Sequence, residues 1–552
     1  MSIKRLFRKE NIIEALKKAG VLRFRVSHSS LIHWCILLLV LFLAFTVRML
    51  PIRWGFHLSE FDPHFQYSLT KHMIDNGFFA WLSWHDYTRW YPYGVNVGGA
   101  LPGLPGTAAL FYVILRTLGL TPAPMFTSNP LTTDPVFNFC IVFPVVMGTL
   151  TCLVIYFLGG DIGGKEVGFL SALLLALNSS YISRTSLGFF DDETVGIFGI
   201  LLFFLFFLRS IEPERSWRNC LAYAVAAGLS LGYVLLSWGA SLYPLGITVL
   251  FVFALLLLRR YSSRLLLSYS VTFGISLFIA INLPRLGFGF LTETYVLAVF
   301  GIFLLLCLLE VSGSIRTLKM KTVFVVGFLG SFAVLFLLLS LWGYATPIGY
   351  KWMTIINPIT RFVGGSSSEL IQSVQEHRPA AWGSFFYDLG IGVLFVPIGL
   401  FFATQNPTNR NIFLCIFGLS SIYFAGSMVR LTLLMAPAFS ILWALALVRL
   451  LRPFITILKE SPVIPRRKMR LEVHVGKEFS GIFIIIALLL LMFTFVLPSP
   501  MSMFPRVLDH AYSPTTIAAA SMPVRPGDPV SDWLDTLNWM RVNLPPSPPD
   551  GP

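Results

Sequence analysis

The sequence has few charged residues for its length. Only 12% of its 552 residues are charged, whereas 55% are hydrophobic, and its mean hydropathy is +0.74. A soluble domain could not keep that much apolar surface away from water, so the composition excludes a soluble enzyme. It indicates a protein that crosses a membrane several times.

Cysteines and internal repeats are also scarce. None of the six cysteines lies in a long polar loop, so we expect packing residues rather than disulfides or metal ligands: Cys35, Cys140, Cys152, Cys220, Cys307 and Cys415. The apolar runs are about 17–24 residues long, which is typical of helices and disfavours a β-barrel. The absence of a short-period repeat disfavours a solenoid, and the absence of paired halves disfavours a secondary transporter.

Acidic residues are fewer than basic ones, and the net charge is +14. The basic residues gather in short loops between apolar runs, as the positive-inside rule describes, so we expect no nucleic-acid partner. Residues 1–30 are basic and polar, which places the N-terminus in the cytoplasm and makes the first apolar run a signal anchor. Ile12, Ile13 and Leu16 indicate either a short amphipathic helix on the inner leaflet or a solvated tail.

Threading the chain with its basic loops inside predicts an all-α polytopic membrane protein of about 13 spans, with the C-terminus outside. The spans are expected at roughly 31–50, 136–158, 166–183, 194–209, 219–238, 241–258, 265–283, 294–311, 322–343, 383–403, 411–428, 431–449 and 480–498. We interpret the apolar stretch 103–120, which follows Pro102, as a helix on the outer surface. Counting it as a span would turn the later basic loops outward.

This threading divides the chain into three regions. Residues 1–30 form a cytoplasmic basic segment, and 31–498 form the transmembrane domain with outer loops 51–135 and 344–382. The polar, proline-rich segment 499–552 is expected to begin a domain outside the membrane, and DWLDTLNWMRVNL at 532–544 has a helical pattern.

Four acidic residues far apart in the sequence fall on the predicted outer side, each near the end of a span: Asp62, Asp191, Glu193 and Glu376. Ionisable residues at a membrane boundary are costly and usually functional. Several carboxylates that converge indicate a site for a hard divalent metal ion. Each also has a plainer interpretation: an interfacial loop for Asp62, a helix N-terminus for the Asp191 turn, and a Gly/Ser-rich linker for Glu376.

Arg430 lies on the same predicted side, between two spans, with apolar residues around it. Its side chain either extends to the lipid headgroups or grips a phosphate with both edges of its guanidinium. Carboxylates and an arginine on one face together indicate metal-assisted chemistry on a lipid-linked phosphate.

Four motifs occur in the same order and spacing as in a known family: EFDPHFQY, YISRTSLGFFDDETVGIF, SVQEHRPAAW and SMVRLTLLMAP. The chain thereby resembles the catalytic subunit of oligosaccharyltransferase over nearly its whole length. The resemblance implies a GT-C glycosyltransferase fold. It also implies transfer of a glycan from a polyprenyl (dolichyl) phosphate or pyrophosphate carrier to the Asn amide of Asn-x-Ser/Thr sequons, with inversion.

The resemblance also assigns roles to individual residues. Asp62, Asp191, Glu193 and Glu376 would bind Mn²⁺ or Mg²⁺, and Asp62 and Glu376 would also be catalytic because they face the acceptor amide. Arg430 would bind the donor phosphate, and Arg184 would line the acceptor site together with Glu376. The implied partners are a lipid-linked oligosaccharide, an acceptor polypeptide, the membrane lipid and additional subunits that the residues do not identify.

The sequence departs from the family at its C-terminal end. Members carry a WWDYG motif in a soluble domain, and no WWD string occurs here, which indicates that most of that domain is missing. Alternatives are another GT-C transferase that uses a polyprenyl-phosphate sugar, such as a protein O-mannosyltransferase, and a catalytically inactive paralogue. A transporter or scaffold would place its acids at mid-membrane depth. The site would face the exterior of an archaeal cell, which we favour, or the lumen of the endoplasmic reticulum.

Overall fold

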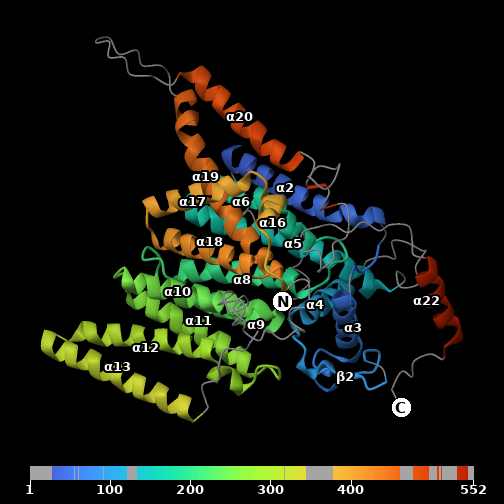
Figure 1. Ribbon diagram of the computed structural model, residues 1–552, viewed down its shortest axis with the longest axis horizontal. Helices are drawn as coiled ribbons and strands as arrows, with labels where there is room; N and C mark the ends of the chain where they lie inside the picture. The colour runs from blue at the N-terminus through green and yellow to red at the C-terminus, as the bar shows by residue number, and fades with distance from the viewer. Residues whose placement is uncertain are drawn as a thin grey trace, which may run out of the picture.

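The computed structural model describes residues 28–54, 56–59, 61–90, 92–120, 134–315, 317–342, 377–459, 476–496, 507–508, 511 and 531–544. Helices dominate this part of the chain, and the longer ones lie side by side in one bundle (Figure 1). The described residues contain a single small sheet, in which β1 (His85–Asp86) pairs antiparallel with β2 (Val95–Asn96). It lies at one end of the bundle beside α3 (Phe61–Asn76) and α4 (Gly103–Thr117).

The bundle helices follow the predicted spans closely. They are α2 (His28–Met49), α5 (Pro135–Gly163), α6 (Lys165–Ala176), α8 (Asp192–Ser210), α9 (Trp217–Ser237), α10 (Leu242–Leu257), α11 (Ser263–Ile281), α12 (Thr294–Ser314), α13 (Leu318–Leu341), α17 (Gly392–Gln405), α18 (Asn409–Ser427), α19 (Thr432–Lys459) and α20 (Lys477–Val496). Within the described residues, nine helices are long and apolar enough to cross a membrane. The total of about 13 spans therefore stays a prediction.

Two of the predicted spans are each built from two helices. The stretch 166–183 consists of α6 and the five-residue α7 (Ser179–Ser183), and the Asn178 side chain caps α7 by accepting from the Tyr181 N–H at 3.2 Å. Asn and Ser side chains compete for backbone hydrogen bonds, so a helix breaks readily at Asn178–Ser179. The stretch 383–403 consists of α16 (Trp382–Leu389) and α17, separated at Gly390, whose φ of 55° favours glycine.

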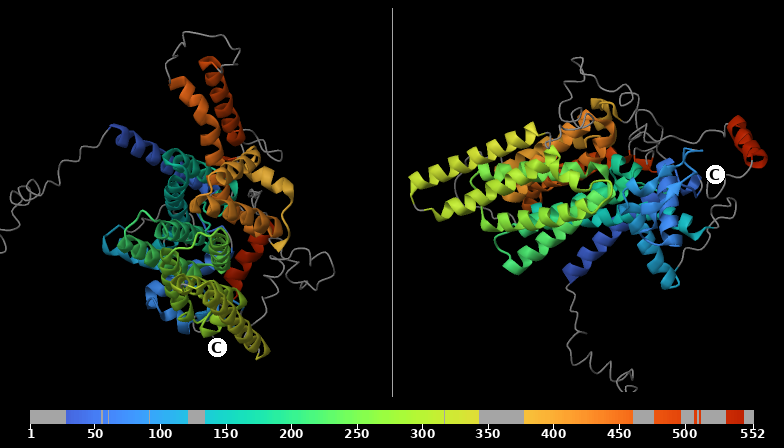
Figure 2. Two further views of the ribbon diagram at one scale, coloured as in Figure 1. Left: turned by 90° about the vertical axis from the view of Figure 1, so that its left-hand side faces the viewer. Right: turned by 90° about the horizontal axis from the view of Figure 1, so that it is seen from below.

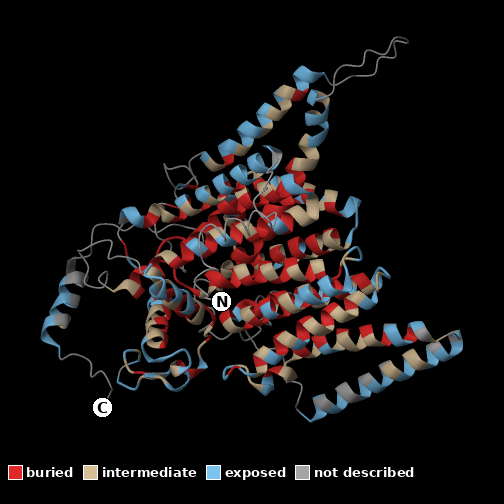
Figure 3. Ribbon diagram, turned by 180° about the vertical axis from the view of Figure 1, so that it is seen from behind, coloured by how far each residue is buried: buried red, intermediate tan, exposed pale blue. Residues whose placement is uncertain are grey.

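The core of the bundle is formed around α19, in which every residue from Thr432 to Leu447 is buried. Figure 3 shows buried residues concentrated on the central helices and exposed ones on α13 and α20. The α12–α13 pair lies at the edge (Figure 2), and large apolar side chains of α13 such as Val323 and Leu341 are exposed. Such a surface is suited to lipid.

The predicted inner loops come together at one end of the bundle. Arg209 at the end of α8 pairs with Asp161 at 2.6 Å, and Arg410 at the start of α18 pairs with Glu212. The other ends of α8 and α18 meet as well, because Glu193 and Arg430 lie 3.1 Å apart. The two predicted sets of loops therefore lie at opposite ends of the bundle, as the charge pattern predicts.

The remaining predicted elements are partly described. The stretch 103–120 forms α4, whose 15 residues are short for a span, and it packs against α3 at the end of the bundle. The helical pattern at 532–544 forms α22 (Ser531–Asn543). The predicted amphipathic segment at Ile12–Leu16, Glu376 and most of the loop 344–382 lie outside the described residues.

Candidate active site

Two buried carboxyl groups mark the start of α8. Asp191 caps the helix, and its Oδ1 accepts a hydrogen bond from the Asp192 N–H at 2.8 Å. Glu193 lies in the first turn, where the helix dipole favours an acid. Only 3% of Asp191 and 1% of Glu193 is exposed. A surface capping role would not require such burial, so the dipole alone does not explain this pair.

The buried pair is incompletely satisfied. Asp191 Oδ2 and Glu193 Oε2 are buried and have no hydrogen-bond partner. Burial, and then the negative charges of Glu193 and Asp192, raise the pKa of Asp191 well above its usual range. Two unpartnered carboxyl oxygens in a buried turn fit a hard cation such as Mn²⁺ or Mg²⁺, because carboxylate oxygens are its preferred ligands.

Arg430 reaches this pair from another part of the chain. It lies in the short 3₁₀ turn η10 (Val429–Leu431) between α18 and α19, and its Nη2 is 3.1 Å from Glu193 Oε1. Its side chain is 28% exposed, so a ligand that arrives at this end of the bundle can contact it. The structure thus brings together the predicted phosphate-binding arginine and a predicted metal ligand that is 237 residues away in sequence.

The first predicted outer segment contacts the same turn through α3. Asp62, in the first turn of α3, is exposed and interacts electrostatically with Asp192. Gln66 lies one turn later, and its Nε2 donates to Asp192 Oδ1 at 3.0 Å. The predictions did not include Gln66, whose amide lies among apolar and aromatic residues in the sequence. Burial lowers the pKa of His64 on the same helix, and the nearby charge of His57 lowers it further.

The loop before α8 is held against this segment by its backbone. The Ser59 N–H donates to the Gly188 carbonyl at 3.1 Å, and the Gly188 N–H donates to the Ile141 carbonyl at 3.0 Å. Gly188 has a φ of +86°, and a Cβ there would lie 2.3 Å from the His57 carbonyl oxygen. Only glycine fits this close approach, which fixes the distance between the two acidic segments.

Arg184 lies between α7 and α8, directly beside the acids. It is 4% exposed, its guanidinium lies 5.2 Å from the centre of the Phe189 ring, and its charge acts on Glu193. Its Nη1 is buried without a hydrogen-bond partner. A buried hydrogen-bond donor without a partner destabilises the folded protein. A hydrogen-bond acceptor on a bound ligand would satisfy this nitrogen.

A second buried arginine, Arg48, escaped the sequence predictions. It is fully buried near the end of α2; its Nε donates to Thr185 Oγ1 at 2.8 Å, and its Nη1 donates to the Ala176 carbonyl at 3.1 Å. Ala176 is the last residue of α6, where the helix dipole favours a cation. An arginine at the end of an apolar run is usually read as reaching for headgroups, and nothing in the sequence distinguishes the two cases.

Glu376 lies outside the described residues, but the residues after it reach the site. The Arg378 carbonyl accepts a hydrogen bond from the Val429 N–H at 2.8 Å, next to Arg430. Among the described residues, no three His, Cys, Asp or Glu side chains form a group that could hold a metal ion. The structure therefore unites Asp191, Glu193 and Arg430, places Asp62 nearby, and leaves the four-carboxylate site a prediction.

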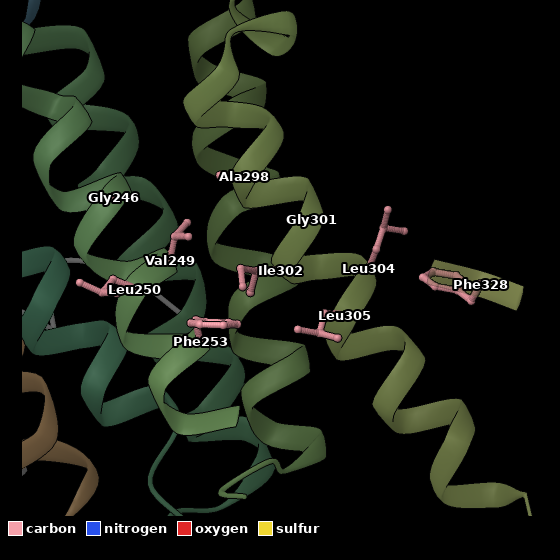
Figure 4. Close-up of a pocket in the computed structure, with 10 residues that line it drawn as sticks. All are labelled: Gly246, Val249, Leu250, Phe253, Ala298, Gly301, Ile302, Leu304, Leu305 and Phe328. Atoms are coloured by element: carbon pink, nitrogen blue, oxygen red, sulfur yellow. The ribbon is translucent and has the colours of Figure 1, made fainter. Parts of the chain in front are cut away.

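Two hollows in the described part of the chain are lined by none of the predicted site residues. One hollow of about 450 Å³ lies between α10, α12 and α13 and is lined by apolar residues such as Val249, Phe253 and Leu305 (Figure 4). It offers no charged group, so it cannot perform polar chemistry. The chemistry-bearing side chains are instead grouped at the end of α8.

Residues 32–443 match the family model described as oligosaccharyl transferase STT3, N-terminal. The chain is similar to the dolichyl-diphosphooligosaccharide–protein glycosyltransferase subunit STT3 of Dictyostelium discoideum, with 30% identity over 88% of this chain and 66% of that protein. Its identity to the STT3B subunit of Oryza sativa subsp. japonica is also 30%, over 92% of this chain and 70% of that protein. The chain therefore spans about two thirds of the length of these curated relatives.

Solved structures of the archaeal oligosaccharyltransferase from Archaeoglobus fulgidus share the fold. The AglB complex with an inhibitory peptide and a dolichol-phosphate aligns with a TM-score of 0.66 at 17% identity, over 93% of this chain and 58% of that chain. The complex with Zn and sulfate aligns with a TM-score of 0.61 at 18% identity, over 92% and 55%. These likenesses confirm the predicted class, an all-α GT-C membrane domain.

Proposed function

The chain belongs to the oligosaccharyl transferase STT3 family, and from that premise we propose that it transfers an oligosaccharide from a polyprenyl phosphate or pyrophosphate to the Asn side-chain amide of Asn-x-Ser/Thr sequons. One observation carries the proposal: the buried, incompletely satisfied Asp191–Glu193 pair meets Arg430 at one end of the bundle. A cation-binding pair beside a guanidinium suits a reaction whose leaving group is a phosphate.

The donor is placed by Arg430 in this proposal. A guanidinium can hold phosphate oxygens with two parallel hydrogen bonds, and the partial exposure of Arg430 leaves the side chain within reach of a headgroup at the membrane boundary. The AglB structure in complex with a dolichol-phosphate supports a lipid-linked donor. Glu193, which contacts Arg430, orients the guanidinium.

Asp62, Asp191, Glu193 and Glu376 would hold Mn²⁺ or Mg²⁺. The ion, when bound, would keep these carboxylates ionised and offset the negative charge that develops on the leaving phosphate. The unpartnered oxygens of Asp191 and Glu193 support this part of the proposal. The neighbouring structure of the Archaeoglobus fulgidus enzyme in complex with Zn and sulfate is consistent with a divalent metal in this fold.

The acceptor amide requires activation because its nitrogen lone pair is delocalised into the carbonyl. Asp62 and Glu376 would accept its two N–H hydrogen bonds and favour rotation about the C–N bond, whose complete rotation costs about 18–20 kcal/mol. Partial rotation combined with positioning suffices to expose the lone pair. Arg184 would contact the acceptor peptide through its buried Nη1.

The proposed transfer forms one bond and breaks one bond at the same carbon. The amide nitrogen attacks the anomeric carbon of the first sugar while the bond from that carbon to the phosphate oxygen breaks, so the configuration inverts. The amide nitrogen loses one proton to Asp62 or Glu376, the carboxylates assigned to the acceptor amide. The electron pair of the broken bond leaves with the phosphate. The site and the C-terminus would face away from the cytoplasm.

The test is transfer of a lipid-linked oligosaccharide to a fluorescent Asn-x-Thr peptide by the purified full chain in the presence of Mn²⁺. The proposal predicts a glycopeptide product with this peptide and none with a control peptide in which Gln replaces the Asn. Product with either peptide equally, or with a peptide that contains only Ser and Thr, would instead support the O-mannosyltransferase-like alternative. No product under any metal condition would support an inactive paralogue.

A further inference from the structure

A five-residue helix carries Arg184 into the site. The helix α7 ends at Ser183, and Arg184 follows as its C-terminal cap. A helix this short is unstable by itself, because forming the first turn fixes the backbone angles of several residues for a single hydrogen bond. The position of Arg184 must therefore be set by the groups that hold α7 in place.

Two contacts hold the end of α7 in place. One is made by the Arg48 side chain and the other by residues that follow the last bundle helix. Arg48 donates to Thr185 Oγ1 just beyond the C-terminal end of α7, at 2.8 Å. Ile182 is fully buried in a cluster with Val47 of α2 and with Val507 and Ala511, which follow the last bundle helix. Both contacts act near the end of α7 that carries Arg184.

Asp388 makes the third contact. Its carboxylate Oδ2 accepts a hydrogen bond from Ser180 Oγ at 2.6 Å, and both groups are buried. Asp388 is 4% exposed and belongs to α16, which follows the segment that reaches the turn of Arg430 through Arg378. A hydrogen bond to a buried carboxylate is among the stronger kinds in a protein. It joins the segment after Glu376 to the helix before Arg184.

We propose that Asp388 is a positioning residue for the acceptor side of the site: through Ser180 it fixes α7, and thereby holds the Arg184 guanidinium beside Glu193. The inference rests on the proposed function for its consequence, because Arg184 is there assigned to the acceptor peptide. Asp388 does not contact the reacting atoms. It couples α16, which follows Glu376 in the sequence, to the arginine assigned to the acceptor peptide.

The chain offers a matched pair of variants for the test. Ser180→Ala removes the hydroxyl that donates to Asp388, whereas Ser179→Ala removes a buried hydroxyl of the same helix that has no hydrogen-bond partner. Asp388→Asn keeps an oxygen acceptor for Ser180 and removes the charge. The proposal predicts a defect with Ser180→Ala, a smaller defect with Asp388→Asn, and no defect with Ser179→Ala.

The first readout does not depend on activity. A thiol introduced by Arg184→Cys in a Cys35→Ser background, which removes the exposed native thiol, is labelled with a membrane-impermeant maleimide. Adding Ser180→Ala should raise the labelling rate by about tenfold, the scale expected for loss of one buried charge-assisted hydrogen bond, and adding Ser179→Ala should leave it unchanged. Equal rates in all three proteins would overturn the positioning role, whether or not the chain is a transferase.

The second readout separates the two proposals. With Arg184 intact, Ser180→Ala should raise the KM for the sequon peptide by about tenfold and leave the KM for the lipid-linked donor unchanged. An equal rise in both KM values, or the same rise with Ser179→Ala, would contradict the inference. If the unsubstituted chain forms no product while the labelling difference is present, the proposed function fails and the link between Asp388 and Arg184 stands.

Discussion

At the residue scale, the account depends on two carboxylates buried at a helix start. Asp191 is held in a place where burial and the negative charge of Glu193 raise the cost of ionising it. Structural acids at helix ends are normally exposed to water, whereas these leave two oxygens unpartnered. The pair is therefore a local source of instability that a bound cation would relieve.

Neutralising Asp191 should stabilise the metal-free protein and weaken its response to metal. The folded pKa of Asp191 lies above its unfolded value, so ionising it costs stability as the pH rises past the unfolded pKa. Asp191→Asn removes that cost at neutral pH. Thermal unfolding in detergent at pH 7 should show a higher Tm than the unsubstituted chain without Mn²⁺, and a smaller increase when Mn²⁺ is added. A lower Tm without metal would show that the carboxylate is structural.

Replacing Arg430 should weaken the binding of the lipid-linked donor rather than the binding of the acceptor peptide. The guanidinium presents a planar pair of donors that a lysine ammonium cannot reproduce. Both Arg430→Lys and Arg430→Gln are therefore expected to raise the KM for the lipid-linked donor by at least about tenfold, with little change in the KM for the peptide. Steady-state kinetics with each substrate varied in turn measures this. A larger effect on the peptide would place Arg430 on the acceptor side.

At the residue scale, the contacts of some residues cannot be predicted from the sequence. Asp191, Glu193 and Arg430 could be singled out because an acid or an arginine at a membrane boundary is unusual in itself, and their roles stay predictions. Gln66 and Arg48 could not, because a glutamine in an amphipathic stretch and an arginine at a span end are ordinary. Their roles arise from tertiary contacts with Asp192 and with the α6 end.

At the scale of elements, the break between α6 and α7 shapes the site. A continuous helix over 166–183 would carry the chain past the point where Arg184 now lies beside α8. The fully buried Arg48 holds the break, since it donates to the last carbonyl of α6 and to Thr185 after α7. Hydropathy treats both halves as one apolar run, so the sequence predicts the span and misses the break.

The packing of α5 against this arginine should be sensitive to one added carbon. A Cβ at Gly148 would lie 2.7 Å from Arg48 Nε and 2.8 Å from Thr185 Cβ. Gly148→Ala should therefore destabilise the protein by about 1–3 kcal/mol, the usual cost of overpacking. Gly274→Ala in α11, where the Cβ would meet nothing within 4 Å, is the matched control. Unfolding in a denaturing detergent series measures both, and equal stabilities would contradict this account of the α6–α7 break.

The contact between α3 and α5 should depend on pH. Asp134 caps α5, and its Oδ2 accepts from Tyr67 at 2.7 Å and from Lys71 at 2.5 Å. Burial alone would raise the pKa of Asp134, but the hydrogen bonds from Lys71, Tyr67 and Val136 outweigh it and lower the pKa. The stabilisation is present above the unfolded pKa of a carboxyl and is lost as the pH falls through the folded value.

The Asp134→Asn variant should therefore lose stability relative to the unsubstituted chain at pH 7 and differ from it progressively less towards pH 3. The Lys71 side chain is 45% exposed, so the ion pair itself contributes little and the partly buried hydrogen bonds from Tyr67 and Val136 carry the effect. Thermal unfolding across this pH range measures the difference. A difference that is constant with pH would show that the carboxylate charge does not hold α3.

At the scale of the whole molecule, charge and hydropathy predicted the arrangement well. The basic loops placed at one end do meet there, since Arg209 and Arg410 pair with Asp161 and Glu212. The sequence predicts this because a membrane allows only two sides for each loop. It cannot predict which helices lie side by side, and so the approach of Arg430 to Glu193 required the structure.

The central claim is that distant loops assemble one metal site. The most direct measurement is Mn²⁺ binding to the purified full chain by electron paramagnetic resonance, beside Asp191→Asn, Asp62→Ala and Glu376→Gln. The account predicts one bound ion per chain, with affinity weakened in all three variants by at least about tenfold, the usual scale for loss of a coordinating or supporting group. Binding that is absent, or that is indifferent to these substitutions, would contradict it.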